Sequence, residues 1–248
     1  MGHRGGNRDL PENSLENFKK GIESGHLDII YLDVNLTKDL EVVVFHDSNL
    51  YNQTGKDVLL RDVNYKDLPP LIFNSHTYKI PRLDDIFTAF PSTPISINIE
   101  SDNPKIVELI GNLIKNHDRE KITIWGSHYH VSIHRNCGIQ FPKLSRFFSD
   151  RSIRRILLAY WIGILPFIPL HCQVFETPIS TGLFNLMIPN LFQHLNDRGI
   201  PVIIFDEGYQ GLNSEGDWEL VRSSGVNGIC TSKMKELKSW FQAVVSRQ

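Results

Sequence analysis

The sequence predicts an α/β fold, a (β/α)8 TIM barrel, from three observations. Short β-branched runs alternate with helical patterns along most of the 248 residues, and this alternation is typical of a parallel sheet with crossover helices. Seven strand–helix pairs can be traced, and an eighth strand would have to lie just before His3; eight repeats in roughly 250 residues fit a barrel. No glycine-rich dinucleotide fingerprint follows any strand, which argues against the rival doubly wound open sheet. We therefore expect one barrel domain over residues 1–248.

The elements follow in order along the chain. The predicted strands are 28–36, 41–46, 95–99, 121–125, 139–145, 172–177, 201–205 and 226–231. The predicted helices are 14–24, 103–117, 128–136, 183–198, 214–223 and 233–246. Ser14 is the expected N-cap of the first helix, although Asn13 would serve as well. The first barrel strand has to lie just before His3, where only Met1 and Gly2 stand, so we expect it to be truncated.

Residues 48–82 interrupt this alternation. The stretch is polar and rich in turn residues, and it has no place in the repeating scaffold. A long excursion of this kind is predicted to be an insertion on the barrel, placed after the second strand.

The most apolar part of the chain is residues 154–170. Its apolar run is about fifteen residues long, below the roughly twenty that a membrane-spanning helix needs, and Pro166 and Pro169 interrupt it. Two interpretations stay open: a barrel helix with a buried loop, or a surface segment that dips into a membrane, with Trp161 at the interface. We favour membrane contact, which the arginines at 146, 151, 154 and 155 would assist.

The composition of the chain limits the classes of partner and the compartment that we expect for it. The chain has 26 basic and 28 acidic residues, so we expect no nucleic-acid partner. The cysteines at 137, 172 and 230 lie far apart without metal-type spacing, which predicts three buried thiols in a reducing compartment. The start of this chain has no signal-peptide pattern, so an intracellular location is expected.

Polar residues gather where the predicted strands end. His3 and Arg4 end the first strand position, Asp33 ends the second, and His46 ends the strand after it. Residues 98 and 100, an asparagine and a glutamate, end the strand 95–99 and share one face. The carboxyl ends of barrel strands form the mouth where active sites lie, so these side chains are expected to converge.

Phosphodiester cleavage is the chemistry that this set suits. One histidine can take a proton from a nucleophilic hydroxyl or water while the other protonates the leaving alkoxide. Arg4 can bind a phosphate with its planar fork. A divalent cation on carboxylate oxygens would offset the charge that develops on the phosphoryl oxygens.

These residues lie in motifs that resemble a known family. The segments GHRGGN, PENSLENF, LDVNLTKD and VVVFHD occur in that order within the first fifty residues. They are similar to the glycerophosphodiester phosphodiesterase family, whose fold is a (β/α)8 barrel with a small insertion after the second strand. The later segments IPRLDDIFTAFPSTPISINI, TIWGS and GILPFIPL resemble its animal lysophospholipase D branch.

The resemblance implies roles for individual residues. His3 and His46 would be the catalytic acid and base, Arg4 would bind the phosphate, and Glu12 and Asn13 would help to shape the substrate site. It also implies a divalent cation, Mg2+ or Ca2+, and a lysophospholipid or glycerophosphodiester substrate. By the same resemblance, the protein would be associated with endoplasmic reticulum or perinuclear membranes.

Three positions depart from the family pattern. Tyr31 stands where the family has the glutamate of its Glu-x-Asp pair, Asn98 replaces a carboxylate, and Glu100 replaces a phosphate-binding lysine. We expect a rearranged metal site of lower affinity made by Asp33, Asn98 and Glu100. The alternatives are a catalytically weakened relative that binds lipid headgroups or a partner, and a metal-free enzyme that relies on its histidines alone.

Overall fold

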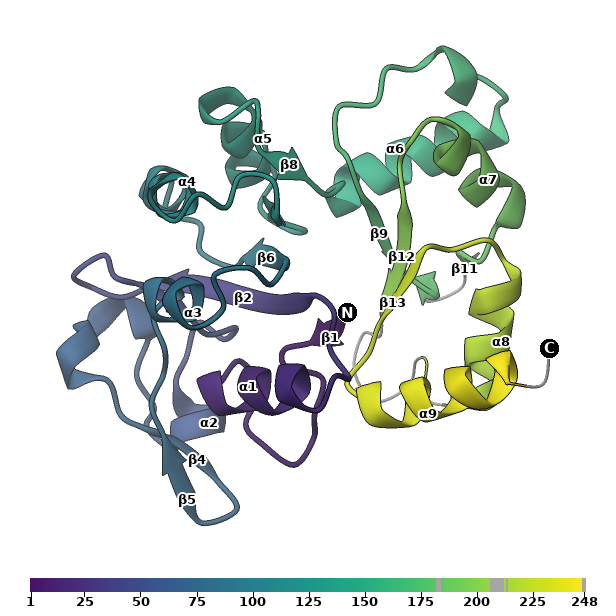
Figure 1. Cartoon of the computed structure of the whole chain (residues 1–248). Coiled ribbons are helices and arrows are strands. Elements are labelled where there is room, and N and C mark those ends of the chain that lie inside the picture. Colours follow the sequence, from purple (N-terminus) through teal and green to yellow (C-terminus); the bar gives the residue numbers. More distant parts are fainter. Residues whose placement is uncertain (182–183, 206–211, 213, 247–248) are drawn as a thin grey trace.

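The computed structural model describes residues 1–181, 184–205, 212 and 214–246 (Figure 1). In this part of the chain, eight strands run parallel around a barrel. They are β1 (Gly2–His3), β2 (Ile30–Leu36), β6 (Ile95–Ile99), β7 (Thr123–Gly126), β8 (Ser145–Arg146), β9 (Phe175–Pro178), β12 (Val202–Phe205) and β13 (Gly228–Cys230).

The strands close into a ring. Hydrogen bonds join them in the orders β1-β2-β6-β7-β8 and β9-β12-β13. Parallel bridges at Phe147–Val174 and Gly2–Thr231 connect the two groups at both ends. The predicted (β/α)8 barrel is therefore confirmed.

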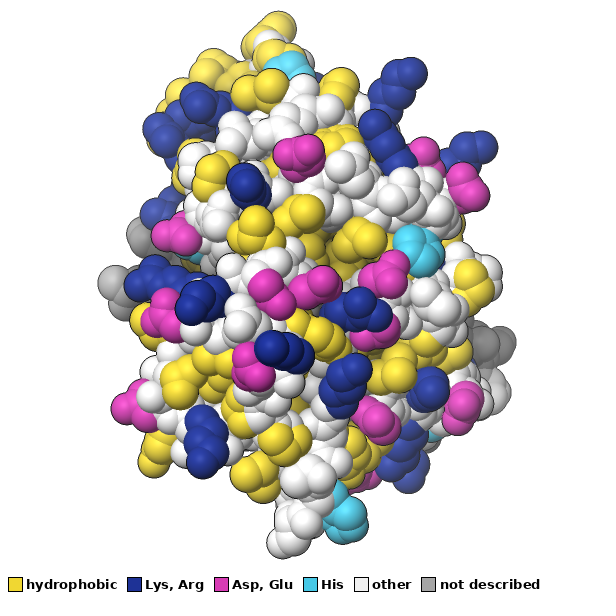
Figure 2. Space-filling view, turned by 90° about the vertical axis from the view of Figure 1, so that its left-hand side faces the viewer, with side chains coloured by type: hydrophobic (Ala, Val, Ile, Leu, Met, Phe, Trp, Pro, Cys, Tyr) yellow, Lys and Arg dark blue, Asp and Glu magenta, His cyan; other side chains and the backbone are white. Residues whose placement is uncertain are grey.

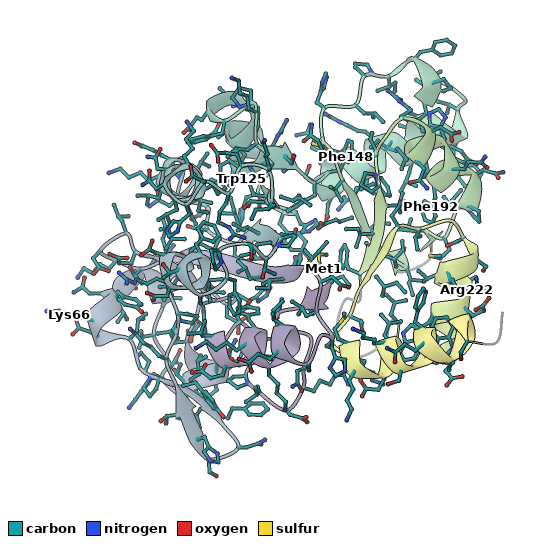
Figure 3. All side chains as sticks on the ribbon, in the orientation of Figure 1. Met1, Lys66, Trp125, Phe148, Phe192 and Arg222 are labelled. Carbon is teal, nitrogen blue, oxygen red and sulfur yellow. The ribbon has the colours of Figure 1, made fainter. Side chains whose placement is uncertain are left out.

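The first strand is as short as expected, yet it completes the ring. Gly2 and His3 pair in register with Ile30 and Tyr31 of β2. On the other side, the amide of His3 donates to the carbonyl of Thr231 at 3.0 Å. Figure 3 places Met1 between the strands of the two groups, where its amino group donates to the carbonyl of Ile229 at 2.8 Å. Two residues thus bridge both neighbouring strands.

Helices cover the outside of the barrel. They are α1 (Leu15–Glu23), α3 (Leu83–Ala89), α4 (Lys105–Asn116), α5 (Val131–Gln140), α6 (Asp150–Trp161), α7 (Pro189–Asp197), α8 (Glu215–Ser223) and α9 (Met234–Val245). Ser14 is the N-cap of α1, because its hydroxyl accepts the amide of Asn17. Figure 2 shows the face that carries α3 and α4, where basic and acidic side chains are interspersed.

Most elements differ from the sequence prediction by one to three residues at their ends, and the larger differences lie around α5 and α7. α5 starts at Val131 and runs to Gln140, so it takes the first residues of the predicted strand 139–145. Residue 183, where a helix was predicted to start, lies outside the described residues, and α7 starts at Pro189. Proline suits a first helical turn because it has no amide hydrogen to leave unpaired. The intervening β11 (Phe184–Asn185) pairs with β10 (Ser180–Thr181) instead. The helix α3 was not predicted.

Residues 48–82 form a compact group of short elements beside β3 (Val42–Val44), which runs antiparallel to β2. They are α2 (Tyr51–Thr54), η1 (Leu60–Asp62), η2 (Tyr65–Asp67), β4 (Leu71–Phe73) and β5 (His76–Tyr78). Leu50, Leu60 and Leu71 share a buried cluster with β3. This shared core fixes the position of the loop that carries His46.

His134 makes the stability of the fold sensitive to acid. Its imidazole is 6% exposed, and burial, followed by the charge of Arg146, lowers its pKa to about 4. An unfolded chain takes up this proton near pH 6.5. Between pH 6.5 and pH 4 the unfolded state therefore binds more protons, and stability falls as the pH drops.

We predict that His134→Gln flattens this pH dependence. Between pH 7.5 and pH 5 the wild type should lose about 2 kcal/mol of unfolding free energy that the variant keeps. Urea unfolding at both pH values measures the difference, with the exposed His76→Gln as control. Equal losses in wild type and both variants would contradict the prediction.

Candidate active site

The loop after β1 has a backbone that only glycine-rich sequence allows. Arg4, Gly5 and Gly6 have φ angles of 51°, 111° and 70°, and positive φ is strained for residues with a side chain. A Cβ on Gly5 would lie 2.5 Å from the side chain of Asn17. The glycines thus let the chain turn sharply against α1 and present Arg4 to the mouth.

Asn17 holds this loop from the first turn of α1. Its Nδ2 donates to the carbonyl oxygens of Asn7, Leu10 and Pro11 at 2.9, 3.2 and 3.2 Å. Asn17 is 1% exposed, and its bond to the carbonyl of Pro11 is buried, while the other two are partly buried. One buried amide therefore fixes the segment between β1 and α1.

Arg4 is fixed by two carboxylates. Its Nη1 donates to both oxygens of Glu12 at 3.1 Å, and its Nε lies 2.7 Å from Oδ2 of Asp33. Burial alone would lower the pKa of Arg4, but Asp33 and Glu12 outweigh it and raise that pKa. The guanidinium is therefore always charged and is held in one orientation.

Asp33 is the buried centre of the mouth. Its Oδ2 accepts from Nδ2 of Asn13 at 3.2 Å, and its Oδ1 accepts from Nδ2 of Asn98 at 3.0 Å. Burial by itself raises the pKa of this carboxyl, yet Arg4 and the two histidines lower it below the usual value. Asp33 thus stays ionised with donors on both oxygens.

The two histidines stand in different surroundings. His3 packs beside the ring of Tyr31 at 5.5 Å, and burial together with Arg4 lowers its pKa to about 4. His46 contacts carboxylates on both sides, with Nδ1 2.7 Å from Asp47 and Nε2 3.7 Å from Glu100. At neutral pH His3 is therefore a free base, whereas Asp47 fixes the tautomer and orientation of His46.

Glu100 completes the network. Its Oε1 accepts from Nδ2 of Asn98 at 2.5 Å. Burial and the charge of Asp33 raise the pKa of Glu100. Two hollows open beside these residues. One of about 880 Å³ is lined by His46 and Glu100, and one of about 430 Å³ is lined by His3 and Arg4.

A model of the glycerophosphoryl diester phosphodiesterase family matches residues 3–137, which carry the predicted site from His3 to Glu100. The chain belongs to this family.

Two curated relatives and one solved structure each align with almost the whole chain. It is 30% identical to human "Lysophospholipase D GDPD1" over 97% of this chain and 85% of that protein. It is 27% identical to a "Glycerophosphodiester phosphodiesterase" of Caldanaerobacter subterraneus, covering 96% and 95% of the two chains. A solved structure, a putative glycerophosphodiester phosphodiesterase from Galdieria sulphuraria, aligns with a TM-score of 0.78 at 16% identity, covering 97% and 96%.

The structure brings the predicted site residues of this family member together in one mouth. Arg4, Glu12, Asn13, Asp33, Asn98 and Glu100 are linked by the contacts above, and His46 reaches Glu100. His3 is adjacent, since it lines the same hollow as Arg4 and Glu12.

The donor set does not fit the divalent cation that the family resemblance implies. Such a cation needs several oxygen ligands. Here both oxygens of Asp33 accept N–H donors, and Asn98 turns its nitrogen toward Asp33 and Glu100. Among the described residues, no three His, Cys, Asp or Glu side chains are grouped so that they could hold a metal ion.

Several residues that shape the mouth were not predicted to do so. Asp47 orients His46, and Gln53 donates to Glu12 at 3.0 Å. The backbone amide of His128 donates to Oδ1 of Asn98 at 3.3 Å. Asp47 could have been found, because it follows His46 directly. The other contacts join distant segments, and nothing local in the sequence signals them.

We predict that Asn17→Ala destabilises the protein by about 1–3 kcal/mol, because the partly buried carbonyl groups of Asn7 and Leu10 lose this donor, while that of Pro11 keeps the hydroxyl of Ser14. Urea unfolding measures the change. Asn112→Ala, at an exposed position in α4, is the control and should not destabilise the protein, because alanine favours a helix more than asparagine does. A loss at residue 17 no larger than at residue 112 would show that the loop is held in another way.

Proposed function

We propose that this chain hydrolyses the phosphodiester bond of lysophospholipids or glycerophosphodiesters, with His3 and His46 as the acid and base. The observation that carries the proposal is the guanidinium of Arg4, fixed on a buried carboxylate, with His3 lining the same hollow and His46 reaching Glu100 on the other side of the network. The names of the relatives support the reaction class.

The two histidines divide the proton transfers. Neutral His3 takes the proton from the attacking water or substrate hydroxyl, whose oxygen forms the new bond to phosphorus. His46 gives a proton from Nε2 to the leaving alkoxide as its bond to phosphorus breaks. Asp47 stabilises the charged imidazole of His46 through Nδ1 at 2.7 Å. Arg4 binds the phosphoryl oxygens and offsets their charge.

We predict that His46→Ala lowers kcat about 10²–10⁴-fold while the melting temperature changes little, because one proton transfer is lost. Choline or ethanolamine release from a lysophospholipid measures turnover, with His76→Ala on the distant β5 as control. Unchanged release from the His46 variant would refute the assignment of this histidine.

A second candidate is a catalytically weakened relative that binds lipid headgroups or a partner. The observation in its favour is Glu100, which places a carboxylate in the mouth where a cation would help to bind phosphate. In that case wild type and His46→Ala bind a lysophospholipid headgroup equally, and neither releases choline or ethanolamine.

We further propose that residues 154–170 bring the protein to an intracellular membrane surface. Trp161 and Ile162 at the end of α6 are 72% and 59% exposed, and Phe167 in η3 (Leu165–Phe167) is 85% exposed. Figure 2 shows hydrophobic side chains at the top of the molecule, at the height of the segment after α6 in Figure 1. No helix among the described residues has the length and apolarity needed to cross a bilayer.

The exposed side of α6 changes character along its length. Arg151, Arg154 and Arg155 lie on it near the start of the helix, and Leu158 and Trp161 follow nearer its end. Residues 154 and 161 are about 10 Å apart along a helix. An apolar tip inserted at the headgroup boundary would thus leave arginines in reach of anionic lipid.

We predict that Trp161→Ser with Phe167→Ser lowers vesicle binding at least about tenfold, since each side chain loses roughly 1.5–3 kcal/mol of apolar burial. Co-sedimentation with vesicles of phosphatidylcholine, with and without phosphatidylserine, measures it, and the loss should be larger with the anionic lipid. Leu220→Ser with Phe241→Ser removes two similarly exposed apolar groups elsewhere. Equal binding by all three proteins would exclude the segment.

A further inference from the structure

We infer that this site binds the phosphate without a resident divalent cation, and that the guanidinium of Arg4 supplies the positive charge instead. The inference rests on the proposed function, since it concerns the same mouth. Two carboxylates that the family pattern places here are replaced by Tyr31 and Asn98. The contacts that these two residues make decide whether the mouth can hold a cation.

Asn98 presents a donor, not a ligand, to the centre of the mouth. Its Oδ1 accepts the backbone amide of His128 at 3.3 Å, so its Nδ2 must face the other way. There Nδ2 donates to Asp33 at 3.0 Å and to Glu100 at 2.5 Å. Turning the amide to offer its oxygen to a cation would break all three bonds. The amide therefore bridges the two carboxylates.

Asn13 is constrained in the same manner. Its Oδ1 accepts the backbone amide of Asp33 at 3.2 Å, while its Nδ2 donates to the Asp33 carboxylate at 3.2 Å. With Nε of Arg4 at 2.7 Å from the same carboxylate, three nitrogen atoms surround its two oxygens. A cation that used Asp33 would have to displace at least one of them.

Tyr31 adds no ligand to compensate. It is 7% exposed and packs in an apolar cluster with Met1 and Ile203. A neutral phenol in such surroundings holds Mg2+ or Ca2+ far less well than a carboxylate does. The position that would complete the family's carboxylate pair with Asp33 is thus part of the barrel interior.

Arg4 still has one nitrogen, Nη2, with which it can bind a phosphate. Nη1 is used by Glu12 and Nε faces Asp33, and within the described part of the chain no contact involves Nη2. The side chain is 19% exposed and lines the hollow of about 430 Å³ together with His3. A phosphate bound there meets a charged donor that two carboxylates already hold in one orientation.

The test measures binding apart from turnover. Calorimetry with Mg2+, Ca2+ and Mn2+ should show no site in the wild type tighter than about 1 mM. Binding of sn-glycerol 3-phosphate should have the same affinity in EDTA and in Mg2+, and Arg4→Ala should weaken it about 10–100-fold. Arg4→Lys keeps the charge without the fork, and thermal melting checks that both variants fold.

A designed variant provides the positive control. Tyr31→Glu, Asn98→Glu and Glu100→Lys together leave the net charge unchanged, and they should create metal binding at least about tenfold tighter than in the wild type. The matched set Tyr31→Gln, Asn98→Gln and Glu100→Lys should create none.

The outcomes separate this inference from the proposed function. A cation bound by the wild type and lost in Asp33→Asn, or phosphate binding that requires Mg2+, would overturn the inference. Hydrolysis that EDTA abolishes would overturn it too, while supporting the function. Absence of hydrolysis with and without metal would refute the function, and the calorimetry would still decide the inference.

Discussion

The ion pair between Arg4 and Asp33 is the constraint on which the mouth of this barrel depends. Asp33 is 1% exposed, and an ionised carboxylate so deeply buried needs a charged partner. That partner comes from a loop whose backbone is held in a left-handed turn. The turn is stabilised by Asn17 in α1, so the first helix and the second strand are coupled through a single pair of charges.

The same pair links the closure of the barrel to its chemistry. β1 contributes only two residues, and their register with β2 sets His3 beside Tyr31. Arg4 follows directly and reaches Asp33 two residues further along β2. A shift of β1 by one residue would turn His3 to the other side and separate the charges. The contacts by which β1 closes the barrel, between β2 and the end of β13, therefore also set the geometry of the site.

Sequence reasoning could predict that the candidate site residues converge, because the strand ends of a parallel barrel meet at one edge. His3, Asp33 and His46 needed no more than that rule, together with motifs whose spacing is local. It could not foresee how Asn98 is turned, because the deciding donor is the amide of His128, thirty residues away and on the next strand's loop. Helix starts were missed for another reason. The residues before Pro189 include the short strands β10 and β11, which pair with each other, and hydrophobic periodicity does not reveal this local pairing.

The apolar tip of α6 raises a question of orientation that the fold itself constrains. α6 leads from the carboxyl end of β8 back to the amino end of β9, so Trp161 and Phe167 lie at the rim opposite the mouth, and Arg151 lies near the mouth. If Trp161 and Phe167 alone met the membrane, the barrel axis would stand upright on the bilayer, and the proposed catalytic residues would lie away from it. If the whole exposed side of α6 lay along the membrane, both the apolar end of the helix and its arginines would reach the lipid. The edge of the barrel mouth would then lie at the headgroups. For the lysophospholipid substrate proposed above, the second orientation would shorten the path from bilayer to Arg4, and it would turn the charged and apolar groups of this side of α6 toward the lipid together.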